Sequence, residues 1–211
     1  MKKTTFIFDF DGTIADSLQM GVDIYNDQIA SKFRCKKIEE KNIEILKGTS
    51  FHKLLQDHNI SFLKLPILLF QLKRKMAKKM DEVQLIDDIK LSLDKLHEMG
   101  YKMGVLTSNN KKNVKSFLKH YQINHLFQFI YSEKNPLGKD KAIKKMMKSE
   151  SLNEVIYVGD ESRDIEACKK VGVDIISVGW GFNTISHLRK YNPNYLIKKP
   201  LELIEIAETL V

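Results

Sequence analysis

Short apolar runs and amphipathic stretches alternate along much of the chain. Five runs rich in β-branched and aromatic residues are predicted strands, at residues 4–9, 102–108, 128–132, 155–160 and 174–180. Four stretches with helical spacing of apolar residues are predicted helices, at residues 87–99, 111–121, 139–148 and 162–171. Strands that alternate with helices in this way indicate an α/β fold, a Rossmann-like doubly wound parallel sheet with helices on both faces.

One interval, from about residue 15 to residue 83, breaks this alternation. It contains no convincing strand, and its apolar residues follow helical spacing over residues 17–33, 39–47 and 62–80. Because the interval is too long for one crossover helix, we expect an inserted all-helical cap domain beside the sheet. The predicted organisation is a Rossmann-like catalytic core at residues 1–14 and 84–211, with the helical cap domain at residues 15–83.

Composition is that of an ordinary globular protein, with 43% hydrophobic and 29% charged residues among 211. The net charge of +8 raises the question of nucleic acid. The lysines are spread over every predicted helix, however, and no zinc-ligand spacing is visible, so we expect no specific nucleic-acid partner. Cys35 and Cys168 are expected to be thiols, since they are far apart in sequence and flanked by charged residues.

The apolar runs of the sequence are short. The run in MKKTTFIFDF is too short for a signal peptide, and the run around Pro66 is shorter than a bilayer span. We therefore expect a cytoplasmic protein without a membrane partner.

Candidate chemistry is concentrated where predicted strands end. Asp9 ends the first predicted strand and Asp11 follows it, Ser108 and Asn109 end the second, and Asp160 ends the fourth. Asp164 lies in the first turn of the next predicted helix, and Lys139 begins the helix before that strand. Functional groups of open α/β sheets gather at the carboxyl ends of the strands. These side chains are therefore expected to lie close together, although two carboxylates at Asp9 and Asp11 repel each other.

This set of residues resembles the haloacid dehalogenase-like hydrolase superfamily, and more closely its phosphoglycolate phosphatase-like group, which has a helical cap after the first strand. The matching segments, in order, are DFDGT, the Ser-Asn of LTSNN, Lys139 in LGKDKAI, and GDESRD. The resemblance extends over essentially the whole chain. It implies a phosphatase rather than a dehalogenase, because dehalogenases of this family keep only the first aspartate. Lys139 is followed by Asp140 where the family often has proline, and Lys134 is the alternative lysine.

The acidic cluster requires a cation, because a phosphomonoester dianion does not approach bare carboxylates unaided. Mg²⁺ suits ligation by oxygen atoms with several waters retained. Asp9 and Asp160 can each supply one oxygen, and the main-chain carbonyl of Asp11 can supply a third. Asp164 is expected to contact the cation indirectly, through water or another ligand.

The other roles follow from position. Asp9 is expected to attack phosphorus and form an aspartyl-phosphate, while Asp11 protonates the leaving oxygen and later activates water. Gly12 allows a tight turn after the strand. The remaining polar groups are expected to bind the phosphoryl group or balance its charge: Thr13, Ser108, Asn109 and Lys139.

Several alternatives remain open from the sequence. The expected substrate is a small phosphorylated metabolite, and the protein is a monomer or a homodimer. The same residues would serve a phosphomutase, and a non-catalytic binding protein on this fold is a third possibility. Asp16 and Ser17 are expected to cap the first helix of the insert. The break at residues 47–52 either faces the active site or is a structural turn.

Overall fold

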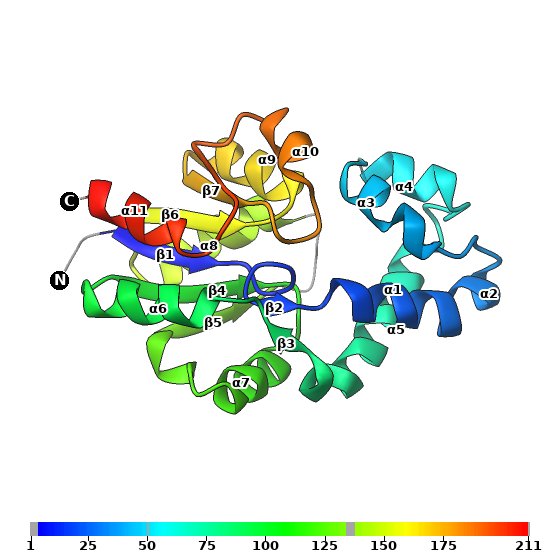
Figure 1. The fold of residues 1–211 in the computed structure, drawn as a ribbon, viewed down its shortest axis with the longest axis horizontal. Helices are drawn as coiled ribbons and strands as arrows, with labels where there is room; N and C mark the ends of the chain where they lie inside the picture. Colours follow the sequence, from blue (N-terminus) through cyan, green and yellow to red (C-terminus); the bar gives the residue numbers. More distant parts are fainter. Residues whose placement is uncertain (1–3, 50, 134–137, 211) are drawn as a thin grey trace.

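A computed structural model of the chain describes residues 4–49, 51–133 and 138–210, and within these ranges six parallel strands form one sheet (Figure 1). The strand order is β5-β4-β1-β6-β7-β8. The strands are β1 (Thr4–Phe8), β4 (Lys102–Thr107), β5 (Phe129–Ser132), β6 (Glu154–Gly159), β7 (Asp174–Val178) and β8 (Tyr195–Ile197). The predicted α/β class with a doubly wound parallel sheet is therefore confirmed. The order places β1 between β4 and β6, where the direction of winding changes.

Side chains of β1 alternate between the two faces of this sheet. Phe6 and Phe8 pack into one core cluster, and Ile7 packs into the other. Helices α6 (Ile89–Glu98), α7 (Lys111–His120) and α11 (Glu202–Thr209) contribute to the first cluster. Helices α8 (Lys139–Ser149), α9 (Ser162–Val171) and α10 (Ile185–Arg189) contribute to the second. Helices cover both faces of the sheet, and all five residues of β1 are accordingly apolar or threonine. Asp9, the first polar residue of the candidate site, directly follows the strand.

Sequence periodicity located most of the core elements. The five predicted strands and four predicted helices are present, with ends within two residues of those expected. Strand β8 and helices α10 and α11 were not predicted. Strand β8 has only three residues and α10 only five, so neither shows a full period of apolar and polar positions. A short 3₁₀ turn, η3 (Asn124–Leu126), precedes β5.

Between β1 and α6 lies a helical insert, which we define as residues 17–83. Its elements are α1 (Leu18–Gln28), α2 (Ala30–Phe33), η1 (Glu40–Asn42), α3 (Ile43–Lys47), α4 (Phe51–Asp57), α5 (Leu65–Met76) and η2 (Ala77–Glu82). Figure 1 shows the insert beyond the carboxyl ends of the strands. Eight of its buried residues form a separate apolar cluster, whereas Met80 and Val83 pack in the first core cluster. The eight are Ile24, Tyr25, Ile29, Ala30, Leu55, Ile60, Leu65 and Leu68. The single helix predicted at 17–33 is broken at Ile29, and α4 was not predicted.

Two short segments connect the insert to the core, one before it and one after it, and these two segments pair with each other. Strand β2 (Ala15–Asp16) pairs antiparallel with β3 (Gln84–Leu85). The expectation that residues 15–83 contain no strand is therefore wrong at β2. Two residues are too few for a visible alternation of polar and apolar positions, so the sequence pattern gave no sign of this pair.

A second contact joins the insert to the core at the break after α3. The main-chain carbonyl of Lys47 accepts hydrogen bonds from Asn183 Nδ2 at 3.1 Å and from the Thr184 N–H at 3.0 Å. Nδ1 of His187 lies 3.1 Å from the carbonyl oxygen of Gly48. The break at residues 47–49 thus rests on the loop that follows β7, while the side chain of His52 lies outside the described residues.

Neither cysteine forms a disulfide. Cys35 is half-buried and Cys168 is buried, and both are free thiols, as expected. Within the described ranges, no helix combines the length and the apolar composition needed to cross a membrane.

Helix α6 offers a matched pair of leucines for testing its packing. Leu93 is fully buried against the sheet, whereas Leu91 is 49% exposed. We expect Leu93→Ala to lower the free energy of unfolding by about 2–5 kcal/mol, because it leaves a cavity in the core. Leu91→Ala should change it by only about 0.5 kcal/mol. Urea denaturation followed by circular dichroism measures both, and equal losses would contradict this packing.

Candidate active site

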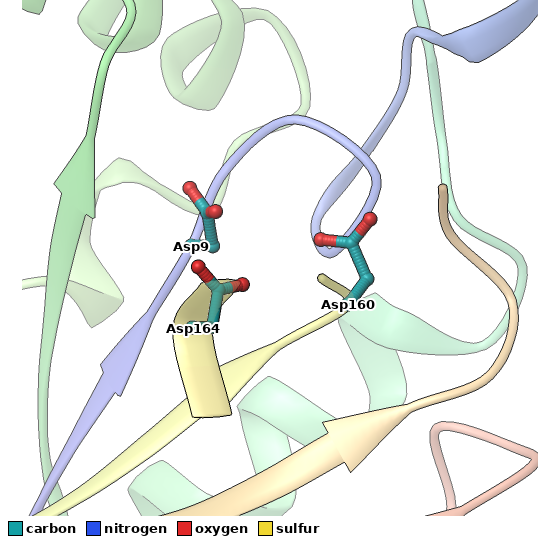
Figure 2. A group of neighbouring side chains, drawn as sticks. All are labelled: Asp9, Asp160 and Asp164. Atoms are coloured by element: carbon teal, nitrogen blue, oxygen red, sulfur yellow. The ribbon is translucent and has the colours of Figure 1, made fainter. Parts of the chain in front are cut away.

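Three buried carboxylates meet at the carboxyl edge of the sheet. Asp9 directly follows β1, Asp160 directly follows β6, and Asp164 lies in the first turn of α9. Figure 2 shows the three side chains, which come from neighbouring elements. One oxygen of each lies within 4.8 Å of the others. The structure therefore brings together the carboxylates of three of the four aspartates predicted to contact the cation, at the point where the strand order reverses.

Lys139, the first residue of α8, lies between two of these carboxylates. Its Nζ donates to Asp9 Oδ2 at 2.6 Å and also to Asp164 Oδ1. Burial alone would lower the pKa of Lys139, but the charges of Asp164 and Asp9 raise it well above the usual value. The lysine is therefore a permanent cation in this site. The alternative lysine, Lys134, lies outside the described residues.

Asp160 is held by neutral donors on both oxygens. The Thr13 hydroxyl donates to Oδ1 at 2.8 Å, and the Phe182 N–H donates to Oδ2 at 2.7 Å. Burial, together with the charges of Glu161 and Asp9, raises the pKa of Asp160 well above the usual value. Without a cation beside it, the ionised form of this carboxylate is thus costly. The Thr13 side chain, expected to face the substrate, instead supports Asp160.

Gly12 brings the turn after β1 against the Asp160 carboxylate. Its φ is +78°, in the left-handed region that favours glycine, and a Cβ there would collide with Asp160 Oδ2. Both the conformation and the close approach therefore require glycine at this position.

Asp11 is oriented by two side-chain donors. The Ser17 hydroxyl donates to Oδ1 at 3.0 Å, and Asn109 Nδ2 donates to Oδ2 at 3.3 Å. Burial, with a smaller contribution from Asp9, raises the pKa of Asp11 to about 6. Part of the Asp11 population can thus hold a proton near neutral pH.

The expected helix-capping role of Ser17 is wrong for its side chain. Ser17 occupies the N-cap position of α1 and is fully buried, yet its side chain makes no capping hydrogen bond. Its hydroxyl is bonded to Asp11 instead, which links the first residue of the insert to the site. Asp16 is exposed, and its backbone pairs within β2.

The loop after β4 supplies the second polar segment. Ser108 lines a small pocket together with Lys139 and Arg163. The Asn109 N–H donates to Thr107 Oγ1 at 2.9 Å, and its side chain reaches Asp11. Asn110 caps helix α7, since its side chain accepts from the Lys112 N–H at 2.8 Å. Ser108 and Asn109 are therefore not needed as the helix cap.

Sequence reasoning missed several groups that reach this site, among them Arg163, the Phe182 N–H, Ser17 and Lys73. Ser17 contacts Asp11, and Lys73 of α5 donates to the main-chain carbonyl of Ser108 at 3.3 Å. Ser17 and Lys73 both belong to the helical insert, Ser17 six residues after its partner Asp11 and Lys73 35 residues before its partner Ser108. Lys73 has no local signal that separates it from the many other lysines of the chain.

The charges of this cluster fit a divalent cation. Three carboxylates carry three negative charges when ionised, and Lys139 offsets one of them. The two remaining charges, and the oxygen donors that bear them, are what a hard divalent ion such as Mg²⁺ prefers. Asp9 and Asp160 could hold such an ion directly. Asp164 is a candidate as well, because both oxygens of every one of the three carboxylates accept a hydrogen bond, those of Asp164 from Lys139 and the Glu161 N–H.

Comparison with known proteins agrees with this geometry. A family model described as haloacid dehalogenase-like hydrolase matches residues 6–178. A phosphoglycolate phosphatase of Synechococcus elongatus is 30% identical over 207 residues, covering 97% of each chain. A pyrophosphatase PpaX of Halalkalibacterium halodurans is 22% identical over 216 residues, covering 98% of each. A solved haloacid dehalogenase-like hydrolase from Streptococcus pneumoniae superposes with a TM-score of 0.78 at 23% identity, covering 98% of each chain, which supports the same fold.

Replacement of Gly12 tests the fit of the turn against Asp160. Gly172, which ends α9, is a matched control, because its φ is +69° but nothing lies within 4 Å of the Cβ position. Gly172→Ala should cost about 1–2 kcal/mol of stability from backbone strain alone. Gly12→Ala should cost more, and should also displace Asp160.

Displacement of the Asp160 carboxylate can be measured separately from the loss of stability, by the effect of Mg²⁺ on the melting temperature. We expect Mg²⁺ to raise the melting temperature of the wild type and of Gly172→Ala, because binding to the native state stabilises it. Gly12→Ala should lose at least half of that rise. An unchanged rise in Gly12→Ala would contradict the contact between this turn and a cation-binding carboxylate.

Proposed function

The chain belongs to the haloacid dehalogenase-like hydrolase family, and we propose that it is a Mg²⁺-dependent phosphatase acting on a small phosphomonoester through an aspartyl-phosphate. The observation that supports this mechanism most directly is the placement of Asp9 beside Lys139, Asp160 and Asp164, with Asp11 held nearby. Phosphoryl transfer depends mainly on positioning and on relief of charge, and this cluster offers both.

In the first step, an Asp9 oxygen forms a bond to phosphorus as the bond from phosphorus to the leaving oxygen breaks. The Asp9 carboxylate is fixed for this role, because Oδ1 accepts from the Phe10 N–H at 2.7 Å and Oδ2 accepts from Lys139. Ser108 and Asn109, in the loop after β4, would bind the phosphoryl oxygens. Lys139 would stabilise negative charge shared by Asp9 and the phosphoryl group.

Asp11 would transfer the protons. It would donate one to the leaving oxygen, and it would then take one from the water that attacks the aspartyl-phosphate, releasing phosphate and restoring Asp9. Its raised pKa, about 6, favours the protonated form that the first step needs. The hydrogen bonds from Ser17 and Asn109 fix the direction of its side chain.

The proposed Mg²⁺ ligands are Asp9, Asp160 and the main-chain carbonyl of Asp11, with Asp164 acting indirectly. When bound, the ion would neutralise the repulsion between the carboxylates and the incoming phosphomonoester. Thr13, Gly12 and the Phe182 N–H would serve by holding Asp160 in place.

We also propose that the helical insert, together with the two residues of β2 before it, is a cap domain spanning residues 15–83, over a core of residues 1–14 and 84–211. It lies over the carboxyl edge of the sheet and is joined to the core by the β2–β3 pair. Such an insert would admit substrate when open and exclude water when closed. The relatives named as phosphoglycolate phosphatase and pyrophosphatase make a small phosphorylated metabolite the natural substrate to test.

Asp9 is the residue whose loss should stop turnover. We expect Asp9→Asn to lower kcat for p-nitrophenyl phosphate by at least about a thousandfold, because the amide is not a nucleophile. Asp16→Asn, which removes the exposed carboxylate of β2, should stay within about twofold of the wild type.

Phosphate release, measured colorimetrically, tests this pair, and circular dichroism checks that both variants fold. Substantial phosphate release by Asp9→Asn would refute the assigned nucleophile. Product isomerisation of a sugar phosphate by the wild type, without phosphate release, would instead identify a phosphomutase.

Removal of divalent cations should abolish activity. Dialysis against EDTA is expected to leave less than about 1% of the phosphatase rate, because three acidic groups would then face the phosphomonoester with only Lys139 to offset them. Added Mg²⁺ should restore the rate. Full activity in a sample shown by elemental analysis to be free of metal would contradict the proposed cofactor.

A further inference from the structure

One cation of the helical insert reaches the pocket of the core. Lys73 lies near the end of α5 and is half-buried, and its Nζ donates to the main-chain carbonyl of Ser108 at 3.3 Å. Ser108 lines the same small pocket as Lys139 and Arg163. By contrast, Lys75 on the same helix donates to Gln28 within the insert, at 2.6 Å. The ammonium group of Lys73 therefore lies at the junction of the insert and the proposed phosphoryl site.

The surroundings of Lys73 contain charges of both signs. Burial lowers its pKa and the charge of Arg163 lowers it further, whereas Asp11, Asp9 and Glu161 act in the opposite direction. Glu161 forms an ion pair with Arg163. The direct hydrogen-bond partner of Lys73 that the structure shows is a neutral carbonyl. An anion bound beside Lys73 would give its ammonium group a stronger, charge-assisted partner than this carbonyl.

The position of Lys73 also indicates which part of a substrate it would meet. Asp9 and Lys139, on the core side, define where the transferred phosphoryl group would lie. Asp11, which would protonate the leaving oxygen, accepts a hydrogen bond from Asn109, the neighbour of the Ser108 that Lys73 contacts. The rest of the leaving group would therefore extend toward the insert, and toward Lys73.

We propose that Lys73, whose ammonium group contacts Ser108 at the pocket that Arg163 also lines, is a specificity-determining residue that binds a second anionic group on the leaving portion of the substrate. The substrate class is then a small phosphomonoester or diphosphate whose leaving group itself bears a carboxylate or a phosphoryl group. This inference rests on the proposed phosphatase function. It goes further by assigning a recognition role to one residue of the insert.

A plainer role for Lys73 is to offset the charge of the aspartates. Such a lysine would support hydrolysis of every phosphomonoester equally, whereas a recognition residue would affect only substrates with the second anion. The two roles are therefore distinguished by the ratio of the kcat/KM values for substrates with and without the second anion. The rate for a single substrate does not distinguish them.

The test compares Lys73→Gln with Lys75→Gln, which removes the same charge from the same helix. The substrates are 2-phosphoglycolate, whose leaving group bears a carboxylate, inorganic pyrophosphate, whose leaving group is a phosphate, and p-nitrophenyl phosphate, whose leaving group has no second anion. For each enzyme, kcat/KM is measured with saturating Mg²⁺. The selectivity is the kcat/KM for each anionic substrate divided by that for p-nitrophenyl phosphate.

We expect the wild type to favour at least one of the two anionic substrates, and the favoured substrate identifies the second anion as carboxylate or phosphate. Lys73→Gln should lower that selectivity about 10- to 100-fold, the scale of one charge-assisted hydrogen bond. Lys75→Gln should leave it unchanged. Lys73→Arg should restore part of it, because a guanidinium also binds carboxylate and phosphate.

Several outcomes would overturn the inference. One is an equal loss on all three substrates in Lys73→Gln, and another is an unchanged selectivity. A third is a wild type that hydrolyses p-nitrophenyl phosphate in preference to both anionic substrates. A wild type that releases phosphate from none of the three would contradict the proposed phosphatase function itself, and so is distinguishable from these.

Discussion

The structure is arranged around a concentration of like charge. Asp9, Asp160 and Asp164 are buried within one small cluster, and Lys139 is the described cation in direct contact with two of them. Burying unbalanced carboxylates destabilises a fold, so their presence here needs support from their surroundings. That support comes from the Thr13 hydroxyl, the Phe182 N–H and the tight turn at Gly12. The core thus holds together groups that would otherwise repel each other, and that repulsion is what a cation and a phosphoryl group can relieve.

Much of this arrangement was predictable, because it follows from local sequence. Parallel strands have their carboxyl ends at one edge, so residues directly after predicted strands must lie near each other. Asp9, Asp160 and Asn109 all occupy such positions, and Lys139 and Asp164 lie in the first turns of predicted helices. A buried strand also has a clear signature, since nearly all of its residues are apolar. The roles assigned to these residues stay predictions, whereas their proximity is observed.

The insert was harder to predict, for physical reasons. Its helices are short, and they leave large apolar residues such as Ile45, Ile67 and Phe70 exposed, so its apolar positions do not mark one buried face. The break at Ile29 and the pairing of β2 with β3 depend on tertiary contacts that no local pattern encodes. The same is true of Ser17 and Lys73, whose partners Asp11 and Ser108 belong to the core. Residues of this kind are found only once the chain is folded.

The loop after β7 connects the position of the insert to the acidic cluster. The Phe182 N–H binds the Asp160 carboxylate, and the next residue, Asn183, donates from its side chain to the Lys47 carbonyl of the insert. Asn183 also accepts from the Ser162 N–H, at the start of α9, the helix that bears Asp164. One loop therefore holds a proposed cation ligand on one side and the insert on the other. If the insert opens as proposed, its contact with Asn183 must break while that between Phe182 and Asp160 can persist, because the two hydrogen bonds use different groups. Access to the site can then change without displacing the carboxylates that are proposed to hold the cation and attack phosphorus.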